Sequence, residues 1–127
     1  MSSIVLDASA LLALLNAEKG ADLVLESLPR AIISTVNYAE VVTRLALLGM
    51  PEDEIHNTLG VLGLDATSFD DEQAFQSGLL APQTQSLGLS LGNRACLALA
   101  LKTKSVALTA DRTWQKLQVG VEIRLIR

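Results

Sequence analysis

The sequence has few residues of the types that most often form cross-links, act as nucleophiles or stack on bases. Its 127 residues include one cysteine, one histidine and four aromatic residues. A single cysteine cannot form an internal disulfide, which favours a reducing, cytoplasmic location. Cys96, between Ala95 and Leu97, is expected to be a small core residue rather than a nucleophile. His56 is expected on the solvated surface, and so few aromatic side chains cannot support extensive base stacking.

Long apolar segments and targeting signals are also missing. The longest uncharged stretch, residues 73–93, is interrupted by Gln, Ser, Gly and Pro, so nothing predicts a membrane-spanning helix. The first residues, Met1 to Asp7, have no basic region and reach a charge too early for a signal peptide. We therefore expect a protein that works away from membranes.

The composition is apolar for a small domain. Half of the residues are hydrophobic, 19% are charged, and the mean hydropathy is +0.37. A chain of 127 residues has room for one hydrophobic core and not for two, so we expect a single domain over residues 1–127. The apolar content predicts that part of the surface is covered in an oligomer.

Charge is divided unevenly along the chain. The net charge of −4 argues against a nucleic-acid partner. However, residues 1–93 carry 12 acidic and 3 basic residues, whereas residues 94–127 carry 2 acidic and 7 basic residues. Carboxylates beside a basic C-terminal third suit a metal site that cuts phosphodiesters. A chance division of solvated surface charge explains the counts equally well.

Short β-branched segments alternate with longer helical ones, which indicates an α/β fold with a mainly parallel central sheet flanked by helices. Strands are predicted at residues 3–7, 31–34, 64–69, 105–109 and 121–126. Helices are predicted at residues 8–16, 19–28, 35–48, 51 onwards, 70–80 and 91–102, with a short one around Trp114. Thr35 and Ser90 are the expected N-caps of two helices, and residues 82–88 are expected to form a loop.

Three acids fall where the ends of predicted strands meet. Asp7 ends the first strand, Asp111 follows the strand at 105–109, and Glu40 lies in the helix after the second strand. Because ligands collect at the carboxyl ends of parallel strands, a divalent cation could join these acids. Each acid also has a structural explanation. Asp7 and Asp111 could cap helices, and Glu40 could pair with Arg44 one turn on, so position alone supports both interpretations.

Four segments, in order along the chain, resemble the motifs of PIN domains. They are V-L-D-A-S-A-L-L-A-L-L (Val5–Leu15), S-T-V-N-Y-A-E-V-V (Ser34–Val42), G-L-S-L-G-N-R-A-C-L-A-L-A (Gly88–Ala100) and L-T-A-D-R-T-W (Leu108–Trp114). The set spans nearly the whole chain and is most similar to the VapC toxins of bacterial type II toxin–antitoxin systems.

The resemblance implies a ribonuclease that uses Mg²⁺ or Mn²⁺ held by three or four acids. Asp7, Glu40 and Asp111 match acidic positions of the family, and Asn93 stands where most members have an aspartate. The implied catalytic and metal-binding set is therefore Asp7, Glu40, Asn93 and Asp111. One or two cations would neutralise the scissile phosphate and lower the pKa of a bound water, which makes hydroxide available near neutral pH.

Five further residues are weaker candidates. Ser9 and Thr109 carry hydroxyls that could orient carboxylates or a water, although a helix start and a strand position explain them as well. Arg94, Arg112 and Lys116 could grip substrate phosphates, or could belong to a solvated surface. Arg112 and Lys116, four residues apart, are expected on one helix face.

Asn93 keeps a second function open. A PIN-like fold without one acid could be a binding module that engages an antitoxin or RNA without cleavage. An amide NH₂ cannot ligate a cation, so we expect a crippled enzyme that Asn93→Asp restores. The asparagine is native or introduced; because active toxins poison the cells that express them, we favour an introduced change. A haloacid-dehalogenase-like phosphotransferase is a weaker alternative, since it needs an Asp where this chain has Ser9.

The partners follow from the same resemblance. RNA is the implied substrate, and a small antitoxin that covers the acidic groove, often with a basic side chain among the carboxylates, is the implied inhibitor. Together with the apolar composition, the resemblance implies a homodimer whose surface includes apolar helices of the N-terminal half.

Overall fold

The computed structural model describes residues 3–127, within which five strands form one sheet in the order β3-β2-β1-β4-β5. All neighbouring strands are parallel. The strands are β1 (Ile4–Leu6), β2 (Ala31–Ser34), β3 (Asp65–Thr67), β4 (Val106–Thr109) and β5 (Ile123–Leu125). The helices are α1 (Ala8–Leu15), α2 (Ala21–Ser27), η1 (Leu28–Arg30), α3 (Thr35–Leu47), α4 (Glu52–Gly60), α5 (Asp71–Leu79), α6 (Ala81–Thr84), η2 (Gln85–Leu87), α7 (Leu91–Thr103) and η3 (Arg112–Lys116). The predicted α/β fold is confirmed.

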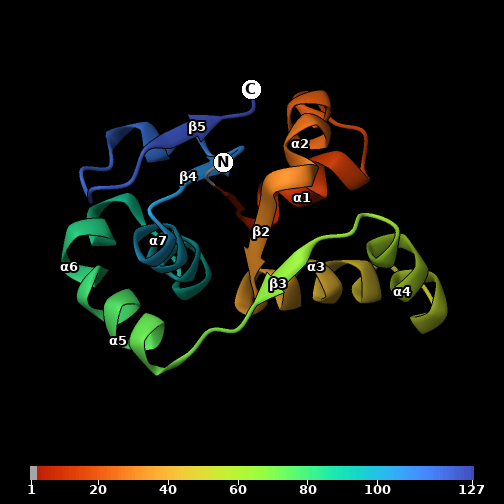
Figure 1. Ribbon diagram of the computed structural model, residues 1–127, viewed down its shortest axis with the longest axis horizontal. Coiled ribbons are helices and arrows are strands. Elements are labelled where there is room, and N and C mark those ends of the chain that lie inside the picture. The colour runs from red at the N-terminus through yellow and green to blue at the C-terminus, as the bar shows by residue number, and fades with distance from the viewer. Residues whose placement is uncertain (1–2) are drawn as a thin grey trace.

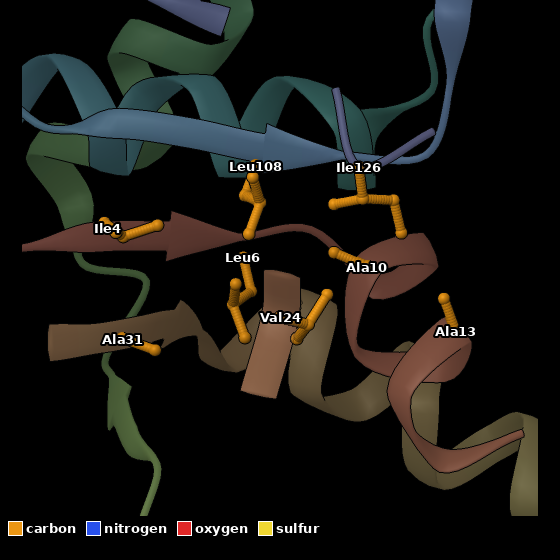
Figure 2. Packing of buried hydrophobic residues seen from close by; sticks show 8 residues of the cluster. All are labelled: Ile4, Leu6, Ala10, Ala13, Val24, Ala31, Leu108 and Ile126. Carbon is orange, nitrogen blue, oxygen red and sulfur yellow. The ribbon is translucent and has the colours of Figure 1, made fainter. Parts of the chain in front are cut away.

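Side chains that alternate along the central strands explain why helices cover both faces of the sheet. Ile4 and Leu6 of β1 belong to one buried cluster. In it they pack with Ala10 of α1 and Val24 of α2 (Figure 2). Val5, between them, packs on the other side with buried residues of α7. Figure 1 shows the result: α1 and α2 lie on one side of the sheet, and α5, α6 and α7 lie on the other.

The order of the strands creates a switch point between β1 and β4. From β1 the chain proceeds to β2 and β3 on one side, and it later adds β4 and β5 on the other side. In open parallel sheets, ligands bind in the crevice at the carboxyl ends of the two strands that flank such a point. Leu6 pairs with Leu108, so the two strands end side by side. Asp7 follows directly after β1, and Thr109 ends β4.

Two predicted local features are wrong. Ser34, not Thr35, caps α3, because its hydroxyl accepts the N–H of Val36 at 3.2 Å. Residues 82–88, expected as a loop, form most of α6 and η2. Pro82 is tolerated there because it lies in the first turn, where the missing N–H would have had no helical acceptor. Within residues 3–127, none of the helices has the length and apolar character that a membrane span requires.

Candidate active site

Asp7 lies at the carboxyl end of β1 and caps α1. Its Oδ1 accepts hydrogen bonds from the Ala10 amide and the Ser9 hydroxyl, both at 2.8 Å. Its Oδ2 accepts from the Thr109 hydroxyl at 2.5 Å. The residue is only 2% exposed. A buried carboxylate is tolerated when donors surround it in this way.

Thr109 joins Asp7 to Asp111. Its hydroxyl donates to Asp7 and accepts the backbone N–H of Asp111 at 3.0 Å. The Asp111 side chain caps η3, where its Oδ1 accepts from the N–H and the hydroxyl of Thr113 at 3.0 and 2.8 Å. The Ser9 hydroxyl accepts the backbone N–H of the residue after Thr109 at 3.0 Å. Two hydroxyls therefore hold both acids at the switch point.

The surroundings of Asp7 disfavour the charged form of its carboxyl group. Burial raises the pKa of Asp7 above its ordinary value of 3.8. Hydrogen bonds from Thr109, Ala10 and Ser9 oppose this rise, and the negative charge of Asp111 adds to it. A cation or a proton near Asp7 would relieve the cost, since either removes uncompensated negative charge.

Glu40 lies in the second turn of α3 and is exposed. Its Oε1 accepts from the side-chain amide of Asn37 at 2.8 Å. The same Nδ2 donates to the backbone carbonyl of Gly92 in α7 at 2.9 Å. Among the described residues no ion pair joins Glu40 to Arg44. Glu40 is therefore hydrogen-bonded to the amide of Asn37 and does not form the predicted ion pair with Arg44.

The buried thiol of Cys96, in α7, is influenced by the charges of both Asp7 and Glu40. Burial raises the pKa of its thiol well above the ordinary value, and the charges of Asp7 and Glu40 raise it further. The thiol stays protonated in the core, as expected of a packing residue rather than a nucleophile.

Asn93 is bonded within the first turn of α7. Its Oδ1 accepts from the backbone N–H and the hydroxyl of Ser90 at 2.9 and 3.0 Å, and the Ser90 hydroxyl accepts the Asn93 N–H at 3.2 Å. This reciprocal capping box confirms Ser90 as the N-cap of α7. It also turns the Oδ1 of Asn93 toward its own helix end. Arg94 donates from Nη1 to the Ser77 carbonyl of α5 at 3.1 Å, so it links two helices.

Arg112 and Lys116 are exposed on η3, whose N-cap is Asp111. The element is a 3-10 helix. With three residues per turn, residues four apart are about 120° apart around the axis. The expectation that these two side chains share one helix face is therefore wrong, because it assumed an α-helix.

The model of the PIN domain family matches residues 4–119. The chain belongs to the PIN domain family. Solved structures with a similar fold include a toxin–antitoxin complex from Klebsiella pneumoniae, with a TM-score of 0.76, 20% identity and 98% of each chain covered. DNA-bound VapBC from Salmonella typhimurium gives a TM-score of 0.79, 16% identity and 100% coverage of each chain. VapBC-5 from Mycobacterium tuberculosis gives a TM-score of 0.63 and 21% identity. The match covers 100% of this chain and 99% of the VapBC-5 chain. No curated protein sequence matches the chain.

PIN domains are generally nucleases that depend on divalent metal ions, and the donors of this one are of the right kind. A carboxylate has about four acceptor sites. Asp7 uses three of them, Asp111 two and Glu40 one in the hydrogen bonds above. Within residues 3–127, no three His, Cys, Asp or Glu residues are grouped to hold a metal directly. Since Mg²⁺ keeps several waters and needs only one or two carboxylates, the donors fit a hydrated cation.

Two residues of this PIN domain that contact Glu40, Asn37 and Gly92, are not among the predicted site residues. Asn37 precedes Glu40 by three residues, a spacing that brings side chains together on a helix. That spacing was the available signal for Asn37. Gly92 contacts Glu40 from a different helix, and no local pattern indicates such a contact.

Proposed function

We propose that this PIN domain, over residues 1–127, is a VapC-type ribonuclease toxin that hydrolyses RNA phosphodiester bonds with Mg²⁺ or Mn²⁺. The observation that carries the proposal is the Thr109 hydroxyl, which bonds both the carboxylate of Asp7 and the backbone of Asp111. These bonds lie at the switch point of the sheet, where ligands bind in this fold class. The similarity of the fold to VapBC complexes supports the toxin assignment.

In this proposal Asp7, Asp111 and Glu40 would hold the cation. When bound, the cation supplies positive charge against the scissile phosphate and acidifies a water molecule. The hydroxyls of Ser9 and Thr109 donate to different oxygens of Asp7, so they fix its carboxylate plane. Ligands held in this way lose little freedom when the substrate arrives.

The exposed bases of η3 are the proposed contacts for the RNA backbone. Arg112 and Lys116 follow Asp111 along the chain and are both exposed. Arg94 is a weaker candidate for an RNA contact, because one of its guanidinium nitrogens already donates to the Ser77 carbonyl. Phosphate contacts release counterions, so RNA binding is expected to weaken steeply as salt rises.

Binding without cleavage is the alternative, and one observation favours it. The Oδ1 of Asn93 is occupied by two hydrogen bonds from Ser90. Its amide nitrogen carries no negative charge and cannot ligate a cation. A PIN domain with this residue could engage an antitoxin or RNA and leave the RNA intact.

The test is cleavage of total RNA with Mg²⁺ or Mn²⁺ by this chain and by its Asn93→Asp form, without antitoxin. We expect the aspartate to raise the rate about 10²–10⁴-fold, the usual contribution of a carboxylate that acts on a reacting water. Asn57→Asp is the matched control, because it adds the same charge at an exposed position of α4. It should leave the rate unchanged.

Two results would contradict parts of the proposal. If both forms are equally inert on a broad RNA pool, the nuclease assignment fails and the binding module is preferred. If both cleave equally well, Asn93 is not a site position, and the site consists of Asp7, Glu40 and Asp111.

A small antitoxin and a second copy of the chain are the proposed partners. The antitoxin would cover the acidic groove, in keeping with the toxin–antitoxin complexes that share this fold. Large apolar side chains on α3 and after α4 support a homodimer, since Leu47 is 80% and Val61 83% exposed. Light scattering at high concentration should give the mass of a dimer, and a strict monomer would count against this part of the proposal.

A further inference from the structure

Asn37 is a fully buried amide whose two N–H groups both have acceptors. The residue is 0% exposed and lies in the first turn of α3. Its Nδ2 donates to Oε1 of Glu40 at 2.8 Å and to the carbonyl of Gly92 at 2.9 Å. An amide NH₂ carries two hydrogens, so these bonds use both. One side chain therefore connects an acid of α3 to the first turn of α7.

Gly92 has no Cβ atom, and this absence leaves space for the side chain of Glu40. A Cβ at this position would lie 2.4 Å from Oε2 and 2.6 Å from Oε1 of Glu40. Real Cβ atoms do not approach oxygens this closely, so any side chain here would push the carboxylate away. The backbone of Gly92 is helical and does not need glycine for its conformation. The glycine leaves room for the carboxylate.

We propose that Asn37 is a positioning residue that, together with the space at Gly92, holds the Glu40 carboxylate in its working orientation. The inference rests on the proposed function, in which Glu40 serves the cation. Glu40 is exposed, and a free glutamate on a helix surface samples several rotamers. The Asn37 amide selects among them. The Asn37 bond uses Oε1, so Oε2 is the oxygen that this proposal assigns to a cation or its water shell.

The test measures Mn²⁺ binding to the full-length protein in two backgrounds, this chain and its Asn93→Asp form. Asn37→Ala removes the donor, and Gly92→Ala displaces the carboxylate while leaving a residue that suits a helix. Because residues that orient a metal ligand typically contribute 10–100-fold to affinity, each change should raise the Kd for Mn²⁺ about tenfold or more. Gly92→Ala keeps the test valid if Asn37→Ala folds poorly.

Each variant has a matched control in the same chain. Gln73 is also a buried amide, 1% exposed, whose Nε2 donates to the Ser68 carbonyl rather than to an acid. Gly78 is also a helical glycine, and nothing lies within 4 Å of a Cβ added there. Gln73→Ala and Gly78→Ala should change the Kd for Mn²⁺ less than about twofold, since neither touches the proposed site.

A double-mutant cycle separates positioning from general damage. In a Glu40→Gln background, Asn37→Ala and Gly92→Ala should cause no further loss of Mn²⁺ affinity, because they act only through Glu40. An undiminished loss in that background would overturn the positioning role.

The remaining outcomes distinguish this inference from the proposed function. If Glu40→Gln weakens binding while Asn37→Ala and Gly92→Ala do not, the positioning role fails and the function stands. If Glu40→Gln has no effect, the proposed role of Glu40 fails and the positioning role fails with it. If neither background binds Mn²⁺, both proposals are wrong.

Discussion

The two halves of the candidate site are built in different ways. At the switch point, Asp7 and Asp111 are fixed by hydroxyls, and each acid also caps a helix. Glu40, in α3, caps no helix, is exposed, and is oriented by the amide of Asn37. In the proposed function, the first half would therefore serve both the fold and the chemistry, whereas the second would serve the chemistry alone. Substitutions should separate these halves by their effect on the metal-free protein.

The largest effect on metal-free stability is expected from Thr109→Val. The change keeps the shape of a buried side chain but removes the donor to Asp7 and the acceptor of the Asp111 amide. Leaving buried polar groups without partners costs about 1–3 kcal/mol, and chemical denaturation measures this loss. Thr84→Val is the control: Thr84 is equally buried, but its hydroxyl donates only to helix carbonyls, so about 0.5–1.5 kcal/mol is expected. Equal losses would mean that the Thr109 bridge has no special role.

The free energy of unfolding of the metal-free protein should depend on pH through the ionisation of Asp7, and Asp7→Asn should remove this contribution. Burial raises its pKa above 3.8 in the folded protein. As pH rises through the interval from 3.8 to the raised pKa, the unfolded chain loses this proton first. The metal-free protein therefore loses stability over that interval relative to Asp7→Asn, and the difference is constant above it.

Denaturation of both forms at several values between about pH 4 and about pH 8 checks this sign. A difference between the two forms that grows in favour of the native chain as pH rises would show that the folded protein prefers the charged carboxylate. In that case burial does not raise the pKa of Asp7 in the folded protein.

The smallest effect is expected from Glu40→Gln. Because Glu40 is exposed and caps no helix, its neutral isostere should change the metal-free stability by less than about 0.5 kcal/mol. The same variant should lose the rise in Tm that Mn²⁺ gives the parent protein, since a ligand that binds only the native state stabilises it. A loss in metal-free stability as large as that of Thr109→Val would remove the distinction between the two halves.

The fold was predictable because its signals are local. The acids that end β1 and follow β4, and the Ser90 cap of α7, are each visible within a few residues. The wrong predictions also concern local features, which a few neighbouring residues do not decide. Ser34 and Thr35 are both good caps, and only their backbone geometry decides between them. The loop predicted from Pro82 onwards is a helix, because proline is tolerated in a first helical turn.

The candidate site was less predictable because its support is non-local. The acids stand in recognisable segments, but the bond from Thr109 to Asp7 joins residues 102 positions apart. The bond from Asn37 to Gly92 joins residues 55 positions apart. Asn93 illustrates the converse, since its position in a motif indicated a site and its side chain bonds its own helix cap. Hydroxyls, amides and glycines that position acids become visible only when distant segments meet.

The central claim is that Asp7 and Asp111 hold one divalent cation at the switch point, with Glu40 turned toward it. Anomalous diffraction from Mn²⁺-soaked crystals of the Asn93→Asp form tests this most directly. We predict a Mn²⁺ peak about 2.1 Å from a carboxylate oxygen of each of Asp7 and Asp111, the bond length of an octahedral oxygen site, with Glu40 bound directly or through water. No peak at this edge, or peaks only at other carboxylates, would contradict the claim.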